Sequence, residues 1–133
     1  MRRVCVLGAT GSIGTQALEV IRAHPNELRA VALAAGGTNV ALLAEQVMEF
    51  APELVALADE NALPGFEEAL REVALARGGV PPSFRLTAGE TGITAAASYD
   101  AADVVLNAIT GAAGLIATLA TLESGKTLAL ANK

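Results

Sequence analysis

Short apolar runs alternate with amphipathic segments along the chain. The first run, Arg3–Leu7, leads into a glycine-rich turn and then into a helical pattern that begins at Ser12. Continuous apolar runs of this kind are typical of parallel strands that are covered on both faces. The pattern predicts strands over 2–7, 28–34, 54–58, 84–87, 103–108 and 127–131, and helices over 12–23, 39–50, 65–76, 89–98 and 111–123.

Repeated strand–helix units with short connections predict an α/β fold, a Rossmann-like doubly wound parallel sheet of about six strands. The length of 133 residues suits one domain, residues 1–133. The stretch Leu75–Ser83 contains two glycines and two prolines and is interpreted as a loop inside that domain. Because the chain stops directly after its last apolar run, we expect it to be one domain of a longer protein.

The charge balance narrows the choice of partners. Nine Lys and Arg against 14 Asp and Glu give a net charge of −5, which argues against binding to the phosphate backbone of nucleic acids. No uncharged apolar run reaches the roughly 18 residues of a membrane-spanning helix, so we expect no membrane insertion. Cys5 is the only cysteine, and no leader precedes the first strand, so we expect a reduced, cytoplasmic protein.

The turn after the first strand carries glycines at positions 8, 11 and 14. Residues without a Cβ let a backbone reach a pyrophosphate, and a helix start offers unpaired N–H groups and a positive dipole end. The hydroxyl groups of Thr10 and Ser12 either bind phosphate oxygens or cap the helix. The alternative is a glycine-rich turn that binds nothing. Its place after the first strand favours nucleotide binding.

The loop after the second strand, Ala34–Asn39, bears on the choice of cofactor. It lacks the acid that usually accepts from the ribose 2′-hydroxyl of NAD, so it permits NADP. No Lys or Arg occurs between Arg29 and Arg71. A 2′-phosphate bound here would therefore use Thr38, the Asn39 amide and backbone N–H groups. A plain turn with an Asn helix cap is the alternative, and both interpretations can hold at once.

Two further segments fall at the carboxyl ends of predicted strands, where ligands of this fold bind. The turn Asn107–Gly114 either flanks a nicotinamide or packs a small-residue helix closely. Asn132 and Lys133 suit a carboxamide and an anionic substrate, or form a solvated strand end. His24 is interpreted as a surface histidine. No Cys and His cluster suggests a metal site and no Ser-His-Asp set can be drawn, so no catalytic or metal-binding residue is predicted within this segment.

Four segments together resemble the N-terminal domain of the 1-deoxy-D-xylulose 5-phosphate reductoisomerases. They are Leu7–Gly14, Ala34–Val40, Ala108–Leu115 and Gly125–Lys133, and the resemblance covers essentially the whole chain. One departure is that family members commonly carry a basic residue just before the Asn of the second loop, where this chain has Gly37-Thr38.

The resemblance implies an NADPH-dependent oxidoreductase of non-mevalonate isoprenoid biosynthesis, which rearranges and reduces 1-deoxy-D-xylulose 5-phosphate to 2-C-methyl-D-erythritol 4-phosphate. It implies a divalent cation, Mg²⁺, Mn²⁺ or Co²⁺, and a homodimer, with the metal-binding catalytic domain and the C-terminal domain beyond residue 133. The segment alone is then expected to bind cofactor without turning over substrate. The implied contacts are Thr10, Gly11, Ser12 and Ile13 to the pyrophosphate, Gly36, Gly37 and Asn39 to the 2′-phosphate end, Asn132 near the nicotinamide and Lys133 to the substrate.

Two other functions remain open from the residues alone. A semialdehyde-dehydrogenase-type oxidoreductase has a similar first turn, but its chemistry needs a cysteine nucleophile in a cleft. The only cysteine here lies in a predicted strand. A nucleotide-sensing module without catalysis is the second alternative.

Overall fold

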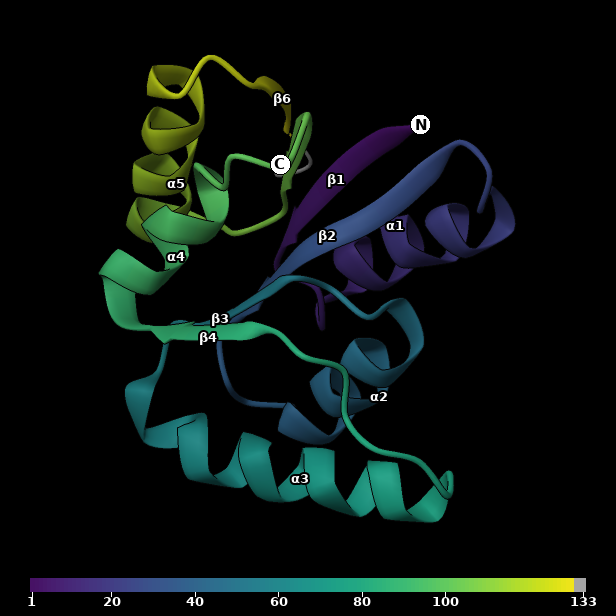
Figure 1. The fold of residues 1–133 in the computed structure, drawn as a ribbon. Coiled ribbons are helices and arrows are strands. Elements are labelled where there is room, and N and C mark those ends of the chain that lie inside the picture. Colours follow the sequence, from purple (N-terminus) through teal and green to yellow (C-terminus); the bar gives the residue numbers. More distant parts are fainter. Residues whose placement is uncertain (131–133) are drawn as a thin grey trace.

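The computed structural model of the chain describes residues 1–130, and the sheet within them lies between two layers of helices (Figure 1). The predicted α/β architecture is confirmed. The six strands are β1 (Arg2–Leu7), β2 (Leu28–Ala35), β3 (Leu54–Leu57), β4 (Arg85–Ala88), β5 (Val104–Asn107) and β6 (Thr127–Leu130). The helices are α1 (Ser12–Ala23), α2 (Val40–Phe50), α3 (Leu63–Ala76), α4 (Gly89–Ala97) and α5 (Gly111–Glu123), with a 3-10 turn, η1 (Glu60–Ala62), before α3.

All neighbouring strands are parallel, and their order across the sheet is β4-β3-β2-β1-β5-β6. The chain therefore moves outward from β1 to β4 and then returns to the other side of β1. Leu7 of β1 pairs with Asn107 of β5 at the carboxyl end of this junction. In open α/β sheets such a reversal of strand order opens a crevice at the carboxyl edge, where ligands bind.

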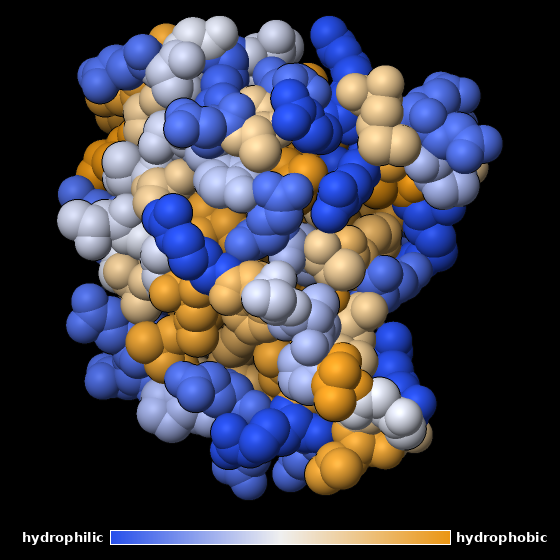
Figure 2. Space-filling model, viewed as in Figure 1, coloured by the Kyte–Doolittle hydropathy of each residue, from blue (hydrophilic) through white to orange (hydrophobic). Residues whose placement is uncertain are grey.

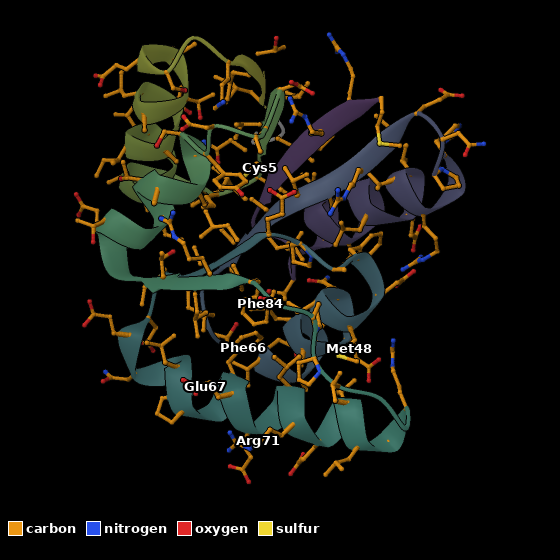
Figure 3. The ribbon with its side chains drawn as sticks, viewed as in Figure 1. Cys5, Met48, Phe66, Glu67, Arg71 and Phe84 are labelled. Carbon is orange, nitrogen blue, oxygen red and sulfur yellow. The ribbon has the colours of Figure 1, made fainter. Side chains whose placement is uncertain are left out.

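Each face of the sheet has its own core, because successive side chains of a strand point to opposite faces. Val4 and Val6 pack against the layer of α1, α2 and α3, whereas Cys5 and Leu7 pack against α4 and α5. In the first layer, Phe66 of α3 meets Phe84 edge to face, with ring centroids 6.3 Å apart, between the helix and the sheet (Figure 3).

The predicted bounds of the elements differ from the structure by one or two residues at many ends, including both ends of β4 and of β5. Asn39 precedes α2 as its cap instead of belonging to the helix. The α3 helix begins at Leu63, two residues before the predicted start, because Pro64 suits the first turn of a helix. The η1 turn was not predicted. None of the helices within residues 1–130 has both the length and the apolar character needed to cross a bilayer.

Candidate functional site

Two strand-to-helix turns and the loop between β2 and α2 lie at the carboxyl edge of the sheet (Figure 1). The backbone ties them together. The N–H groups of Gly8 and Ala9 both donate to the carbonyl oxygen of Ala34 at 2.8 Å, and the Ala108 N–H donates to the Leu7 carbonyl oxygen at 3.0 Å. The first turn is thus held between the ends of β2 and β5, at the point where the strand order reverses.

Glycine is required at two positions of the first turn. Gly8 has a φ of +86°, which side chains with a Cβ rarely adopt. A Cβ on Gly14 would lie 2.0 Å from the Gly8 carbonyl oxygen, so the start of α1 can approach the turn only without a side chain there. Gly11 is exposed and meets nothing closer than 3.4 Å. The packing of the turn therefore does not require glycine at this position.

The start of α1 presents unpaired backbone amides. The N–H groups of Thr10, Ser12 and Ile13 make no hydrogen bond with any residue from 1 to 130. The N-cap position, Gly11, provides no side-chain cap, and the Gly11 N–H itself donates to the Gly8 carbonyl oxygen at 3.1 Å. The predicted capping by Thr10 or Ser12 is therefore not observed. Three N–H groups at the positive end of a helix dipole form an anion-binding geometry.

The second loop contains the Asn helix cap that was one of the two roles expected of it. Asn39 Oδ1 accepts a hydrogen bond from the Leu42 N–H at 3.2 Å and so caps α2. Gly37 has a φ of +119°, and a Cβ there would lie 2.8 Å from the Cβ of Ala62. Gly36 is exposed, and a Cβ added to it would have no atom within 4 Å. The loop therefore offers an open backbone at Gly36 and exposed polar side chains at Thr38 and Asn39.

The third turn is held from inside by Asn107. Its side chain is fully buried, and Nδ2 donates to the Gly114 carbonyl oxygen at 2.8 Å and to Thr118 Oγ1 at 2.9 Å. Its Oδ1 accepts from the Ile109 N–H at 3.0 Å. A Cβ on Gly114 would lie 2.1 Å from the Ile109 carbonyl oxygen. Of the two interpretations left open for this segment, close packing of the helix start accounts for both Asn107 and Gly114.

An apolar groove of about 350 Å³ opens beside these loops, between α4 and α5. The ends of β2 and β3 form one part of its wall. The rest comes from Ile109, just after β5, and from the first two turns of α4 and α5. Glu90 on the rim is its only charged residue, and the others are Ala35, Gly36, Ala58, Ile93, Ile109, Ala112, Ala113 and Ile116. The groove begins at Gly36, so the second loop and the groove form one continuous surface.

Charges are distributed unevenly between the two edges of the sheet. Carboxylates of Asp59, Glu60 and Glu90 follow β3 and β4 at the carboxyl edge. The basic residues of the described chain lie away from this edge. Each is found near the start of a strand, just before a strand, in the second half of a helix or at the end of a helix: Arg2, Arg3, Arg22, Arg29, Arg71, Arg77, Arg85 and Lys126. Among the described residues, the groups at the carboxyl edge that could bind an anion are therefore backbone N–H groups and neutral side chains.

Several predicted residues do not join the site, or cannot be placed. Asn132 and Lys133 lie outside the described residues. His24 is exposed at the end of α1, where its Nδ1 lies 2.9 Å from the Val20 carbonyl oxygen. Among residues 1–130, no three His, Cys, Asp or Glu side chains gather where they could hold a metal ion.

Cys5 is fully buried, and burial raises the pKa of its thiol from 9.0 to about 12. Its Sγ donates to the Ala96 carbonyl oxygen at 3.2 Å. Because the thiolate is the reactive form, this cysteine is not a nucleophile.

Gln46 is a site residue that the sequence analysis missed. It lies on α2, is 6% exposed, and donates from Nε2 to the Ala9 carbonyl oxygen at 2.8 Å. The glutamates on either side, Glu45 and Glu49, have the spacing of an exposed helix face. One signal was present: Gln46 follows Leu43 by three residues, the spacing of one helix face, and Leu43 is buried.

The comparisons with known proteins agree with this geometry. A sequence model of the family "1-deoxy-D-xylulose 5-phosphate reductoisomerase" matches residues 4–133. A curated relative of that name from a Synechococcus species is 47% identical over all 133 residues, which make up 31% of its own length. The relative of the same name from Cutibacterium acnes is 48% identical, and the chain covers 32% of it. The chain thus spans about a third of the length of these relatives.

Solved structures show the same fold. The 1-deoxy-D-xylulose 5-phosphate reductoisomerase from Zymomonas mobilis in complex with NADPH superposes with a TM-score of 0.83 at 37% identity, over 98% of this chain and 32% of that one. A DOX-P reductoisomerase in complex with NADPH, fosmidomycin and magnesium superposes with a TM-score of 0.82 at 36% identity, over 99% and 30%.

Proposed function

The chain belongs to the 1-deoxy-D-xylulose 5-phosphate reductoisomerase family, and from that premise we propose that it is the NADPH-binding domain of such an enzyme. The complete protein rearranges and reduces 1-deoxy-D-xylulose 5-phosphate to 2-C-methyl-D-erythritol 4-phosphate in isoprenoid biosynthesis. The observation that carries the proposal is the set of unpaired N–H groups of Thr10, Ser12 and Ile13 at the start of α1, where the strand order reverses.

We propose a place for each part of the cofactor. The amides of Thr10, Ser12 and Ile13 bind the pyrophosphate, and the bare Gly11 lets it approach the backbone. The adenine ring occupies the apolar groove that begins at Gly36. Gly37, Thr38 and Asn39 receive the 2′-phosphate end through backbone N–H groups and neutral side chains. The groove and the exposed loop beside it support this assignment.

When bound, NADPH supplies the hydride for the reduction. Asn132 near the nicotinamide and Lys133 on the substrate complete the proposed contacts; both lie outside the described residues. The metal ligands, which bind Mg²⁺, Mn²⁺ or Co²⁺, belong to the part of the protein beyond residue 133. The 133-residue chain alone therefore binds the cofactor and does not turn over substrate.

The complete protein is proposed to be a cytoplasmic homodimer that binds neither nucleic acid nor membranes. The outer face of α5 supports the presence of further domains. Leu115, Leu119 and Leu122 expose between 51% and 62% of their surface. Figure 2 shows some hydrophobic residues at the upper left margin of the molecule, where α5 lies in Figure 1. Isolated apolar residues are common on protein surfaces, but a contiguous apolar helix face usually packs against another part of a protein.

The alternatives fit less well. The protonated, buried thiol of Cys5 does not suit a semialdehyde dehydrogenase, which needs a reactive cysteine. Nothing in the described residues favours a sensing module, and the relatives carry the name of an enzyme.

A fluorescence titration tests the proposal. The 133-residue chain is titrated into NADPH while the emission of the nicotinamide ring is followed. We expect saturable binding, which Gly11→Val weakens at least tenfold, because an exposed β-branched side chain would stand where the pyrophosphate approaches. The proposal fails if the chain does not bind NADPH, or if Gly11→Val binds as tightly as the unaltered chain.

A further inference from the structure

Gln46 connects α2 to the first turn across 37 positions of the sequence, through the hydrogen bond from Nε2 to the Ala9 carbonyl oxygen. The helix that carries it is firmly placed. Leu43, Ala44 and Val47 are fully buried under the sheet. Ion pairs join its exposed side to both neighbouring helices, from Arg22 of α1 to Glu49 and from Arg77, the C-cap residue of α3, to Glu45. The position of the Gln46 amide is therefore set by the packing of α2 and not by the turn.

The hydrogen bond determines the direction of the next amide. The peptide bond between Ala9 and Thr10 is trans, so its C=O and N–H groups point in opposite directions. The carbonyl oxygen of Ala9 points to Gln46, so the Thr10 N–H points away from α2. That N–H has no acceptor among residues 1–130. Gln46 thus orients one of the unpaired amides of the first turn.

Stability explains the donor of the Gln46 side chain, because without it the buried Ala9 carbonyl oxygen would lose its hydrogen bond, but stability does not explain the acceptor atom beside that donor. Gln46 Oε1 is buried and has no hydrogen-bond partner among the described residues. An unpaired buried carbonyl costs about 1–3 kcal/mol, so Gln46 pairs the Ala9 carbonyl oxygen while it leaves its own Oε1 unpaired at a comparable cost. Buried polar groups with an unpaired atom are rare, and each calls for a reason other than packing.

The neighbouring turn shows what a purely structural amide looks like. Asn107 also holds a strand-to-helix turn from a buried position, but its Oδ1 and Nδ2 atoms are both hydrogen-bonded. It acts on the turn that follows its own strand. Gln46 is contributed by a different element and satisfies one acceptor in the turn, the Ala9 carbonyl oxygen.

We propose that Gln46 is a positioning residue for dinucleotide binding, which fixes the Ala9–Thr10 peptide so that the Thr10 N–H faces the pyrophosphate. This inference rests on the proposed function. It concerns the pyrophosphate alone, since the hydrogen bond of Gln46 does not involve the second loop or the apolar groove.

The test uses Gln46→Met, which keeps the length of the side chain and removes its donor. We expect the affinity for NADPH to fall about tenfold, the size of effect that follows from one misdirected hydrogen bond to a charged group. The affinity for adenosine 2′-monophosphate, which lacks the pyrophosphate, should stay within about twofold, because no contact of that fragment involves the Ala9–Thr10 peptide. General damage to the fold would lower both affinities together.

A matched control is Thr121→Val, which removes another buried polar group. Thr121 is fully buried and donates to Ala97 and Ala117 carbonyl oxygens on the other side of the sheet, so its loss should lower stability and leave both affinities unchanged. An amide NMR titration of the unaltered chain adds a readout that does not depend on the variant. NADPH and inorganic pyrophosphate should both shift the Thr10 N–H resonance strongly.

The outcomes separate this inference from the proposed function. If the unaltered chain binds no NADPH, the proposed function fails and the inference fails with it. If the unaltered chain binds NADPH but Gln46→Met binds it equally well, or loses both ligands to the same degree, the inference is wrong and the proposed function stands. A Thr10 resonance that does not respond to either ligand would also overturn the inference, even if Gln46→Met does not fold.

Discussion

The carbonyl oxygen of Gly8 lies 2.0 Å from the position that a Cβ atom on Gly14 would occupy. The first turn of α1 therefore packs directly against the residue that follows β1. The space between them has room for the hydrogen atoms of Gly14 but not for a Cβ. This contact brings the helix start, with its unpaired amides, to the edge of the sheet. Stability and ligand binding depend on different glycines of the same turn.

Gly14→Ala and Gly11→Val should separate the two roles. Gly14→Ala forces backbone atoms apart, so we expect a loss of unfolding free energy of about 3 kcal/mol or more. Gly11→Val meets only the Gly8 carbonyl oxygen at an ordinary 3.4 Å, and its φ of −81° suits valine. Its cost should be about 1 kcal/mol, the cost of a poorer N-cap residue. Urea denaturation measures both, and equal losses would contradict the assignment.

Asn107 should be the most sensitive polar position at the third turn. Asn107→Asp keeps the shape of the side chain but cannot donate to the Gly114 carbonyl oxygen or Thr118 Oγ1, and it buries a charge. We expect a loss of about 3 kcal/mol or more. Thr118→Val removes a single hydrogen bond and should cost about 1 kcal/mol. Denaturant titrations in which both variants lose the same free energy would show that the Asn107 network is not what holds the turn.

A cation placed in the second loop should raise the preference for NADPH over NADH. Thr38→Arg adds a charge where no Lys or Arg of residues 1–130 lies, and Thr38 is exposed. We expect NADPH to bind about tenfold more tightly relative to NADH, with a gain that falls as salt is added. Ser83→Arg, at the opposite edge of the sheet, is the control and should leave the ratio unchanged. The ratio of the two dissociation constants measures the effect, and no change for Thr38→Arg would place the 2′-phosphate elsewhere.

Cys5 should make stability fall at alkaline pH. The thiol ionises at 9.0 in the unfolded chain, but burial raises its pKa to about 12 in the folded one. The folded chain therefore holds the thiol proton more tightly than the unfolded chain does. The contribution of Cys5 to stability is complete below pH 9.0 and decreases as the pH rises from there toward 12. Thermal unfolding across this range should show a shallower alkaline decline for Cys5→Ala than for the unaltered chain.

The same burial predicts slow thiol chemistry. Cys5 should react with iodoacetamide only as fast as the chain unfolds. Addition of denaturant should raise the rate of this reaction to the rate of an exposed thiol. A rapid reaction of the folded chain would show that Cys5 is accessible and would reopen the interpretation as a cysteine-dependent dehydrogenase.

The sequence by itself determined the type and order of the strands and the α-helices, and the places of the turns. Apolar runs and helical periodicity depend on which residues are near one another in the chain, so the strand from Arg2 and the helix from Ser12 were predicted to the residue. The same is true of the Asn39 cap, whose hydrogen bond spans three residues. The start of α3 was missed although Pro64 is typical of the first turn of a helix, and the η1 turn was missed because a short 3-10 turn gives little periodic signal.

Only the tertiary structure decided which residues hold the site together. The order β4-β3-β2-β1-β5-β6 places Asn107 beside Leu7, 100 positions away in the chain. The packing of α2 on the sheet directs Gln46 toward Ala9. The arrangement of the elements also leaves the carboxyl edge without a Lys or Arg among residues 1–130. These relationships arise from the crossing of helices over the sheet and from the distance between chain segments in space, and local sequence patterns do not encode either.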